Sequence, residues 1–409
     1  MIIADLHIHS KYSRATSKDL TLENLEKYAR IKGLDILGTG DFTHPKWLAE
    51  LKQNLIEDES GILKTKTGFK FVLSTEISSI YTQEGKTRKI HQLILAPNFD
   101  IVAQINEMLL KWGRLDYDGR PIFGKSALEV VEMCKKVSKN VEIIPCHIWT
   151  PHFSLFGANS GFNSLKECYK DQAKHIFALE TGLSSDPAMN WRLSELDNYS
   201  LVSFSDAHSY WPWRIGRECT IFDLKDITYG NLINAIKNKN PKEFLYTLEF
   251  YPEEGKYHFT GHRNCNISLS PKESLKLNDI CPVCNSKLTI GVLERVEKLA
   301  DRPEGFLPKN AIPFKSLVPL SELLSKFFNF NIASRKVWLE YNKLINNFKS
   351  ELNVLLNVSY EELKKISDEK LADLIIKNRE GKLKVTPGYD GVYGELILNS
   401  KKQKDLTEF

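Results

Sequence analysis

Short apolar runs and amphipathic segments alternate along the first 240 residues of the chain. After a first strand that begins at Ile2, the apolar runs predict strands at 35–39, 69–75, 92–96, 141–146, 176–180 and 201–205. Segments with helical spacing lie at 101–112, 127–137, 165–174 and 188–196. Strands and helices in alternation favour a parallel sheet, which is open or closes into a barrel.

Helix boundaries are marked by capping residues. Thr21 can cap a helix that Gly33 ends. From about residue 299 the pattern is helical, and Ser359 with Glu362 forms a capping box at the start of one of these helices. The sequence therefore predicts a helical section after the α/β section.

Three polar residues follow the first strand at every second position. They are Asp5, His7 and His9. Because side chains alternate across a strand, all three point to the same side. Two imidazoles and a carboxylate on one rigid face are typical of a metal site, and the alternative is a pair of hydrogen-bonded histidines at a strand end.

Further residues of metal-ligand type accompany the later apolar runs. They are Asp41 with His44 close behind, Glu76, His91, His147, Asp206 and His208. The carboxyl ends of the strands of a β/α barrel meet at one rim, where such folds assemble their sites. The sequence therefore predicts a metal centre of histidines and carboxylates at this rim.

Composition narrows the class of protein. With 409 residues, 42% hydrophobic and 26% charged, the chain can bury a large core in two or three domains. A net charge of +4 permits a polyanionic partner without requiring one. No apolar run approaches membrane-spanning length and no signal-peptide pattern is present, so we expect an intracellular, cytoplasmic protein without a membrane partner.

Seven cysteines, an odd number, argue against a disulfide framework. Three of them form two knuckle-like pairs, His262 with Cys265 and Cys281 with Cys284. Two such pairs are typical of a tetrahedral, structural Zn²⁺ site, and His258 is an alternative to His262 as the fourth ligand. The cysteines at 134, 146, 168 and 219 lie on apolar segments and are expected in the core.

These patterns divide the chain into four sections. Residues 1–240 are expected to form the catalytic barrel, 241–300 a small zinc-binding domain, 301–398 a helical C-terminal domain and 399–409 a flexible tail. The expected fold class is therefore α/β with two accessory domains.

The ligand motifs resemble those of the polymerase and histidinol phosphatase (PHP) superfamily of metal-dependent phosphoesterases. The resemblance implies a distorted (β/α)7 barrel with three divalent ions in one cleft. It assigns the first ion to His7, His9, Glu76 and Asp206, and the third to Glu76, His91 and His147.

The resemblance places the second ion on His208 and a residue of the second motif, where this chain departs from the family pattern. The usual Thr-Asp-His is Gly-Asp-Phe at 40–42, so Asp41 is the expected ligand and His44 the substitute. The acidic residue or histidine common after the first motif is replaced by Arg14. We therefore expect two to three divalent cations, Zn²⁺, Mn²⁺ or Mg²⁺, in the active site.

The chemistry expected of such a cleft follows from charge. Clustered divalent ions neutralise a phosphoester, lower the pKa of bound water and stabilise the leaving group. Asp206 and Glu76 are the carboxylates expected at the centre of this hydrolysis. Arg14 can clamp a phosphate oxygen in place of a lost ligand, or form a surface salt bridge instead.

A PHP section, a knuckle pair and the segment PGYDGVYGEL at 387–396, in this order, are similar to the endonuclease Q family. The resemblance implies a nucleoid-associated DNA repair endonuclease that cleaves 5′ of deaminated bases (uracil, hypoxanthine, xanthine) and of abasic sites, with damaged DNA as its partner. The alternatives are a phosphoesterase acting on a small phosphomonoester and a catalytically inactive DNA-binding PHP protein.

Aromatic residues crowd the loops beside the predicted ligands. Trp149, Phe153, Trp211 and Trp213 lie in Gly- and Pro-containing loops and follow neither helical nor strand spacing. They are candidates to stack on an extruded base, the alternative being that they only shape the loops.

The last seven residues match the pattern Gln-x-x-Leu-x-x-aromatic through Gln403, Leu406 and Phe409. This pattern is typical of a peptide that binds a sliding clamp of the PCNA type. A solvated tail is the alternative.

Overall fold

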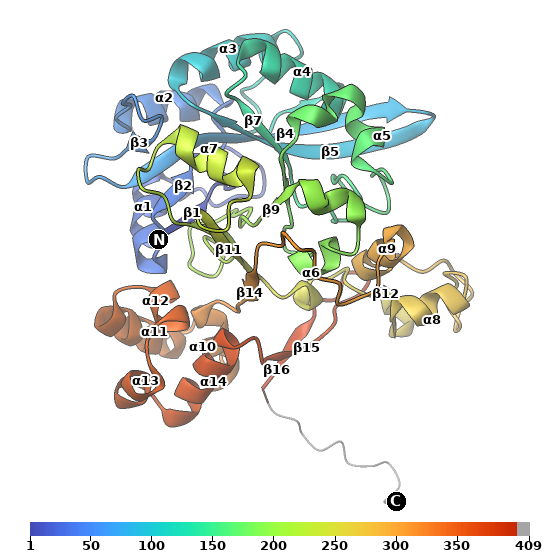
Figure 1. The fold of residues 1–409 in the computed structure, drawn as a ribbon. Helices are drawn as coiled ribbons and strands as arrows, with labels where there is room; N and C mark the ends of the chain where they lie inside the picture. The colour runs from blue at the N-terminus through green and yellow to red at the C-terminus, as the bar shows by residue number, and fades with distance from the viewer. Residues whose placement is uncertain (399–409) are drawn as a thin grey trace, which may run out of the picture.

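A computed structural model describes residues 1–398 of the chain, and its centre is one large curved sheet (Figure 1). The strand order is β14 (Phe314–Ser316), β11 (Phe244–Glu249), β10 (Cys219–Phe222), β1 (Ile2–Asp5), β2 (Ile36–Gly38), β4 (Lys70–Gln83), β5 (Lys86–Ala96) and β7 (Glu142–Pro145). Two short strands, β3 (Leu63–Lys64) and β6 (Ile122–Phe123), also pair with β4. The coarse prediction of a mixed α/β fold is therefore confirmed.

The prediction of an all-parallel sheet is wrong at β4 and β5, which form a long antiparallel hairpin (Figure 1). Its turn is Glu84 and Gly85, with φ of 52° and 73°. Two consecutive residues with positive φ suit the twist of a tight hairpin, and a two-residue turn leaves no room for the helix that a parallel connection needs. The projecting half of the hairpin is polar, so its residues lacked the apolar run that predicted the other strands.

The curved sheet approaches a separate parallel pair, β8 (Ala178–Glu180) and β9 (Ser200–Val202). On one side, the backbone N–H of Ile148 donates to the Glu180 carbonyl at 3.1 Å. On the other side, the N–H of His9 donates to the Ala207 carbonyl at 3.0 Å. The sheet is therefore curled, and the ends of β1, β7, β8 and β9 lie close to one another.

Helices cover the outside of the curled sheet, and capping explains several of their boundaries. The main ones are α1 (Leu22–Lys32), α2 (Pro45–Asn54), α3 (Phe99–Leu110), α4 (Ala127–Val137) and α7 (Tyr229–Asn238). Thr21 caps α1 by accepting from the N–H of Asn24, and Gly33 ends it with φ of 98°. Both capping predictions for this helix are confirmed.

Two predicted helices are shorter in the structure. The segment 165–174 forms α5 (Leu165–Tyr169) and then a 3₁₀ helix, η1 (Lys170–His175), because Lys170 has a positive φ of 47°. The segment 188–196 contains α6 (Pro187–Asn190), with the 3₁₀ helix η2 (Ser194–Asn198) beginning only at Ser194. Apolar spacing predicted the buried faces, but not these breaks.

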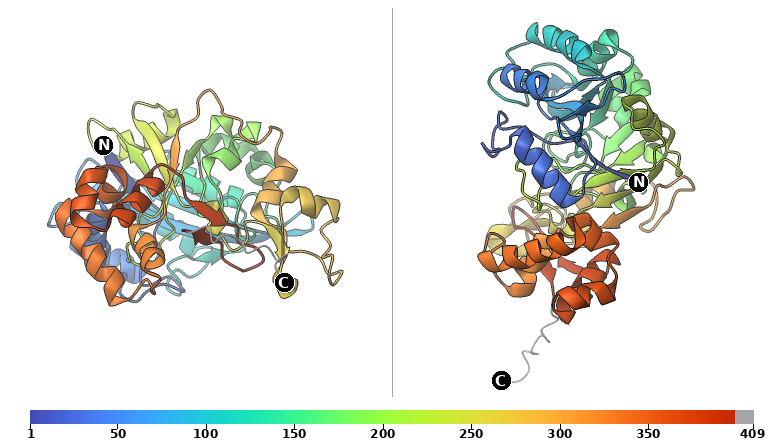
Figure 2. Two further views of the ribbon diagram at one scale, coloured as in Figure 1. Left: turned by 90° about the horizontal axis from the view of Figure 1, so that it is seen from below. Right: turned by 90° about the vertical axis from the view of Figure 1, so that its left-hand side faces the viewer.

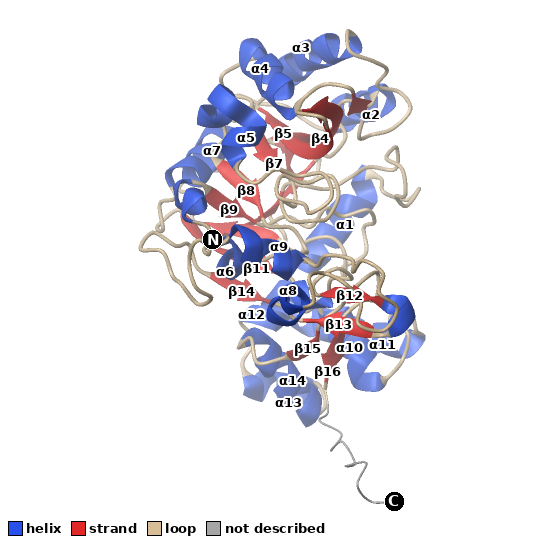
Figure 3. Ribbon diagram, turned by 90° about the vertical axis from the view of Figure 1, so that its right-hand side faces the viewer, coloured by secondary structure: helices blue, strands red, loops and turns tan. Residues whose placement is uncertain are grey.

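The chain continues through a small strand-and-helix section. It contains η3 (Pro252–Glu254), β12 (Thr260–His262), η4 (Arg263–Cys265), β13 (Ile267–Leu269), α8 (Pro271–Lys276) and α9 (Val292–Leu299), seen beside the main sheet in Figure 3. Strands β11 and β14, which flank this section in the sequence, belong to the main sheet. The four-domain division stays a prediction.

The predicted helical section is confirmed. It lies below the sheet in Figure 1 and also in the right-hand panel of Figure 2. It comprises α10 (Leu320–Phe328), α11 (Arg335–Phe348), α12 (Glu351–Leu356), α13 (Tyr360–Ile366) and α14 (Glu369–Arg379), followed by the pair β15 (Lys384–Thr386) and β16 (Glu395–Ile397). Ser359 and Glu362 form the predicted capping box. Within residues 1–398, no helix has the length and apolar character needed to cross a membrane.

A buried ion pair joins the helical section to the α/β section. Lys32 at the end of α1 lies 2.7 Å from a carboxylate oxygen of Glu351 in α12, and both side chains are buried. The Tyr341 hydroxyl and the Leu320 N–H donate to the same carboxylate. Since each charge has its partner and further hydrogen bonds, this contact fixes one section against the other.

Candidate metal centre

Six predicted ligands converge from segments that are far apart in the sequence, with Glu76 and His91 inside β4 and β5 and the other four in segments that follow strands. Their donor atoms form two groups that share Glu76, each with all atoms within 4.8 Å: His7, His9, Glu76 and Asp206, and then Glu76, His91 and His147. We call these six residues the rim cluster. Another such group contains His7, Cys146 and Glu180. The strand pattern thus brings together the residues assigned to the first and third ions.

Glu76 lies at the centre of the rim cluster, within β4. One carboxylate oxygen is 2.6 Å from His91 Nδ1 and 3.3 Å from His147 Nε2. The other oxygen is 3.3 Å from His9 Nε2, and Asp206 Oδ1 is 3.1 Å from the same nitrogen. A single carboxylate therefore faces both groups, which is the geometry of a bridging ligand.

The donor set fits divalent cations. Among residues 1–398, the buried His7 Nε2 has no hydrogen-bond partner, yet it lies 3.8 Å from a Glu76 oxygen and 3.7 Å from Asp206 Oδ1. A buried ring nitrogen without a partner is costly unless a ligand occupies the space in front of it. Imidazole nitrogens and carboxylates around that space suit Zn²⁺ or a related divalent ion.

The two central carboxylates are held in their charged form. Burial alone raises the pKa of Glu76, but the nearby His91 and Arg120 outweigh it and hold the pKa well below its usual range. Burial likewise raises the pKa of Asp206, and His208 and His9 bring the net pKa well below its usual range. Both groups are thus ionised at neutral pH, as metal ligands must be.

A second layer of carboxylates orients the histidines. Glu180 at the end of β8 lies 2.8 Å from His7 Nδ1, and Asp41 lies 3.0 Å from His9 Nδ1. Holding Nδ1 in this way leaves Nε2 of each ring to face the cluster. Sequence reasoning missed Glu180, although it ends a predicted strand as the other ligands do.

The residues expected for the second ion do not come together. The Asp41 carboxylate is occupied by His9 and by Ser10 and Ser13, whose bonds to it measure 2.6 Å and 2.9 Å. The ring of His44 stacks on Tyr12 at 4.4 Å. His208 Nδ1 donates to the backbone carbonyl of Asp206 at 2.8 Å.

Among residues 1–398, neither Asp41 nor His44 nor His208 joins a group of metal-ligand type. Asp41 instead belongs to the layer that orients His9.

Arg120, rather than the predicted Arg14, lies next to the rim cluster. The Arg14 side chain is 70% exposed and lies 3.4 Å from Asp118, which is the surface salt bridge that the sequence left open. Arg120 was not singled out, and its Nη1 lies 3.0 Å from a Glu76 oxygen. Arg120 sits in a loop without periodicity, so no sequence pattern indicated its position.

The aromatic candidates differ in their surroundings. Trp149 is fully buried and donates from Nε1 to Asn190 at 2.8 Å, so it belongs to the core rather than to an accessible surface. The ring of Phe153 lies 4.6 Å from that of His91, beside the rim cluster. Trp211 and Trp213 stack nearly parallel, with ring centroids 5.0 Å apart.

Trp211 and Trp213 line a cavity of about 570 Å³ between the loop after Asp206 and helix α11. Trp338 and Tyr341 of α11 also line it, as does Tyr28 of α1, whose ring lies 5.5 Å from that of Trp211. Aromatic faces together with the ammonium group of Lys27 give this cavity the character of a stacking site, although none of its lining residues belongs to the rim cluster.

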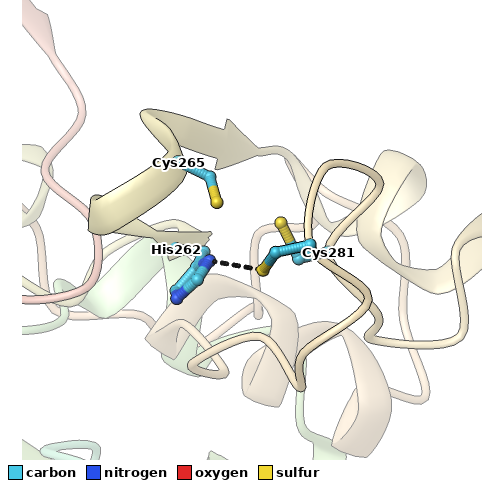
Figure 4. A group of neighbouring side chains, drawn as sticks. His262, Cys265 and Cys281 are labelled. Carbon is cyan, nitrogen blue, oxygen red and sulfur yellow. Dashed lines mark hydrogen bonds between the residues drawn. The ribbon is translucent and has the colours of Figure 1, made fainter.

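The predicted knuckle residues also converge. The donor atoms of His262, Cys265, Cys281 and Cys284 lie within 4.8 Å of one another, and His262 Nδ1 is 3.3 Å from the Cys284 sulfur. Figure 4 labels His262, Cys265 and Cys281 of this group. We call these four residues the zinc group. His258 is buried and is not a member of this group, so His262 rather than His258 lies with the three cysteines.

The clamp-binding residues Gln403, Leu406 and Phe409 lie outside the described residues. Their assignment therefore stays a prediction.

The rim cluster is a group of residues that could hold metal ions, and the fold is that of an endonuclease. Two solved structures share the entire fold. A structure of the lesion-specific endonuclease PfuEndoQ from Pyrococcus furiosus has a TM-score of 0.88 and 31% identity, covering 100% of this chain and 99% of that chain. The chain therefore belongs to the endonuclease Q family.

The other comparisons agree with this membership. A structure of endonuclease Q with a 27-mer duplex, carrying an abasic lesion at the active site, has a TM-score of 0.86 and 31% identity, covering 100% of this chain and 99% of that chain. Residues 319–382 match the family model of the MJ0043 C-terminal domain. The protein MJ0043 of Methanocaldococcus jannaschii is 31% identical over 72% of this chain, which spans only 36% of that protein.

Proposed function

We propose that this protein is a DNA repair endonuclease that hydrolyses the phosphodiester 5′ of deaminated bases (uracil, hypoxanthine, xanthine) and of abasic sites. The observation that carries the proposal is the convergence of six imidazoles and carboxylates, five of them buried and Asp206 partly buried, with Glu76 shared by two groups. Support for the substrate comes from the related endonuclease Q, whose structure holds duplex DNA with an abasic lesion at the active site.

The proposed site holds two to three divalent cations, Zn²⁺, Mn²⁺ or Mg²⁺, on the rim cluster. Bound there, such ions neutralise phosphate oxygens and lower the pKa of water. The chain's own part is to present Glu76 and Asp206 ionised, and to fix His7 through Glu180 and His9 through Asp41. The site is thereby arranged before substrate arrives, which reduces the reorganisation needed in the transition state.

The accessory features have proposed roles as well. We propose that β1, β2, β4, β5, β7, β8 and β9 form the seven strands of a distorted barrel. The zinc group is proposed to hold one structural Zn²⁺, because four protein ligands leave no open position. For damaged DNA, Phe153, Trp211 and Trp213 are the proposed base contacts, and buried Trp149 is left out.

A strand-nicking assay tests the proposed activity. The substrates are a labelled duplex with one uracil, hypoxanthine, xanthine or abasic site, the same duplex undamaged, and p-nitrophenyl phosphate. We expect one cut 5′ of each lesion, with little cleavage of the other two substrates. Asp206→Asn should abolish cutting while DNA binding persists, and exposed Asp223→Asn is the matched control.

Each other outcome rejects the proposal in a specific way. Faster hydrolysis of p-nitrophenyl phosphate than of the lesion duplex indicates a small-molecule phosphoesterase. Lesion binding without any cleavage in Mn²⁺, Mg²⁺ or Zn²⁺ indicates an inactive DNA-binding protein.

We also propose that residues 403–409 bind a sliding clamp of the PCNA type at the nucleoid. Deletion of these residues should abolish clamp binding and leave lesion cleavage intact. Loss of cleavage in the deletion variant contradicts the assignment.

A further inference from the structure

The loop that carries Arg120 is held on several sides. The N–H of Gly119 donates to the carbonyl of Tyr12 at 3.0 Å, and the Thr43 hydroxyl donates to the Gly119 carbonyl at 3.1 Å. Asp118, which is buried, accepts from the N–H of Arg120 at 3.1 Å. These bonds tie the loop to the segment that follows β1 and to the segment that follows β2.

The close approach of this loop requires glycine at position 119. A Cβ atom there would lie 2.3 Å from a carboxylate oxygen of Asp41 and 2.5 Å from the Ser13 hydroxyl. Asp41 is the residue that orients His9, so the loop backbone packs directly against the second layer of the rim cluster. The next residue, Arg120, is thereby directed at the cluster.

Among the described residues, only one nitrogen of the Arg120 guanidinium has a hydrogen-bond partner. Its Nη1 lies 3.0 Å from Glu76, and the side chain is 24% exposed. Within residues 1–398, its Nε and Nη2 make no hydrogen bond, and neither is among the buried unpaired atoms. Glu76 and Asp206 both favour the charged form and raise the pKa of Arg120 despite burial, so the group is a permanent cation. Within the described chain, two donor positions of this cation are therefore left without a partner.

Arg120 adds positive charge to a cluster at which the residues expected to hold a further ion do not come together. In the described part of the chain, Asp41, His44 and His208 form no group, and Arg14 points to the surface. Arg120 brings positive charge to the side of the cluster that contains Asp206.

We propose that Arg120 is a catalytic residue that binds a non-bridging oxygen of the scissile phosphate. This inference rests on the proposed function. Guanidinium N–H groups match the geometry of phosphate oxygens and form strong charge-assisted hydrogen bonds. As water adds to phosphorus and the bond to the leaving oxygen breaks, one proton of the water ends on the leaving oxygen, which becomes a hydroxyl. Arg120 stabilises the negative charge on the phosphate oxygens and keeps its own proton throughout.

Variants at position 120 test the role of the guanidinium. Arg120→Ala should lower kcat on the uracil duplex on the order of 100-fold, with only a severalfold rise in KM. Arg120→Lys keeps the charge but loses the planar fork, and should recover only part of kcat. The matched control is Arg114→Ala, since Arg114 is exposed, pairs with Asp116 and precedes the same loop.

Two measurements besides turnover separate a phosphate contact from a structural role. Metal content should be the same in Arg120→Ala and the parent, and the affinity for uncut lesion duplex, measured in an Asp206→Asn background, should fall severalfold. Cleavage by Arg120→Ala within twofold of the parent overturns the inference. Loss of metal in proportion to kcat also overturns it, because Arg120 would then only hold Glu76. If the parent itself does not nick lesion duplexes, the proposed function fails instead.

Discussion

The rim cluster and the zinc group are both sets of metal-ligand side chains, but the chain builds them in opposite ways. The rim cluster joins residues from position 7 to position 206, is largely buried, and has a second layer of carboxylates behind its histidines. The zinc group comes from two short segments between 262 and 284, and Cys284 is exposed. The rim cluster therefore forms only when distant strands come together, whereas the zinc group needs only two neighbouring turns.

The difference lies in what else stabilises each region. The rim cluster sits above a large core of aliphatic and aromatic side chains. Between residues 259 and 291, the buried hydrophobic side chains are Cys281 and Leu288. A region with so little apolar burial depends on cross-links or metal ligation for its structure. Metal loss should therefore remove activity at the rim cluster and local structure at the zinc group.

The largest expected effect is at the residue shared by both halves of the rim cluster. Glu76→Gln keeps the shape but removes the charge that faces five neighbours of the cluster and Arg120. We expect nicking to fall on the order of 1000-fold or more, because several kcal/mol of charge stabilisation is lost. Thermal unfolding and Zn²⁺ in the zinc group should stay near the parent values. Loss of that Zn²⁺ would contradict the independence of the two sites.

The next largest effect is expected at the zinc group, where a substitution should cost bound metal and local structure. His262→Ala should lower bound Zn²⁺ by about one ion per chain and expose the region 259–291 to limited proteolysis. His258→Ala is the matched control, since His258 is buried nearby but is not a member of the group. Zinc content and cleavage sites found by mass spectrometry give the readout. Retention of zinc by His262→Ala with loss in His258→Ala would exchange the two assignments.

The two regions also show which features a sequence can predict. The zinc group follows from local spacing, and the choice between His258 and His262 needed only the position of one turn. His7 and His9 were predictable because strand alternation is local. Capping by Thr21 and by Ser359 was predictable for the same reason.

Features that depend on the curl of the sheet were not predictable in this way. Asp41 has the right chemistry for a ligand, but its place behind His9 is set by the approach of Ser10 and Ser13. Arg120 reaches Glu76 through a loop that two other segments hold, and no periodic pattern marks such a loop. The β4–β5 hairpin was missed because its projecting half is polar.

A smaller effect is expected from the second layer of the rim cluster. Glu180 accepts from the backbone N–H of His147 at 2.8 Å and holds Nδ1 of His7. Glu180→Gln should weaken metal binding at the rim cluster by roughly 10- to 100-fold, which is the usual cost of changing a group that orients a ligand. Titration of metal-free protein measures this affinity. Zinc at the zinc group serves as the internal control, and equal weakening at both sites would mean that the variant is misfolded.

The smallest effect concerns a buried carboxyl without a cation beside it. Glu249 in β11 accepts hydrogen bonds from the hydroxyls of Thr181 and Ser203, at 2.9 Å and 3.1 Å. Burial raises its pKa to about 8, although these bonds act in the opposite direction. The carboxylates of the rim cluster, surrounded by histidines, have lowered pKa values instead. The pKa of a carboxyl in this fold is therefore raised or lowered according to the charges beside it.

This contrast gives a pH dependence with a definite sign. Between pH 4.5 and pH 8 the folded chain keeps the Glu249 proton while the unfolded chain releases it, so this group lowers the free energy of unfolding as pH rises, by up to roughly 1.4 kcal/mol per pH unit. Glu249→Gln should remove that slope and be more stable than the parent at pH 8 by about 1 kcal/mol or more. Urea unfolding at pH 5.5 and pH 8 measures the difference, with exposed Glu59→Gln as the control. Parallel pH profiles for the parent and Glu249→Gln would show that Glu249 is ionised in the folded chain, as Glu76 and Asp206 are.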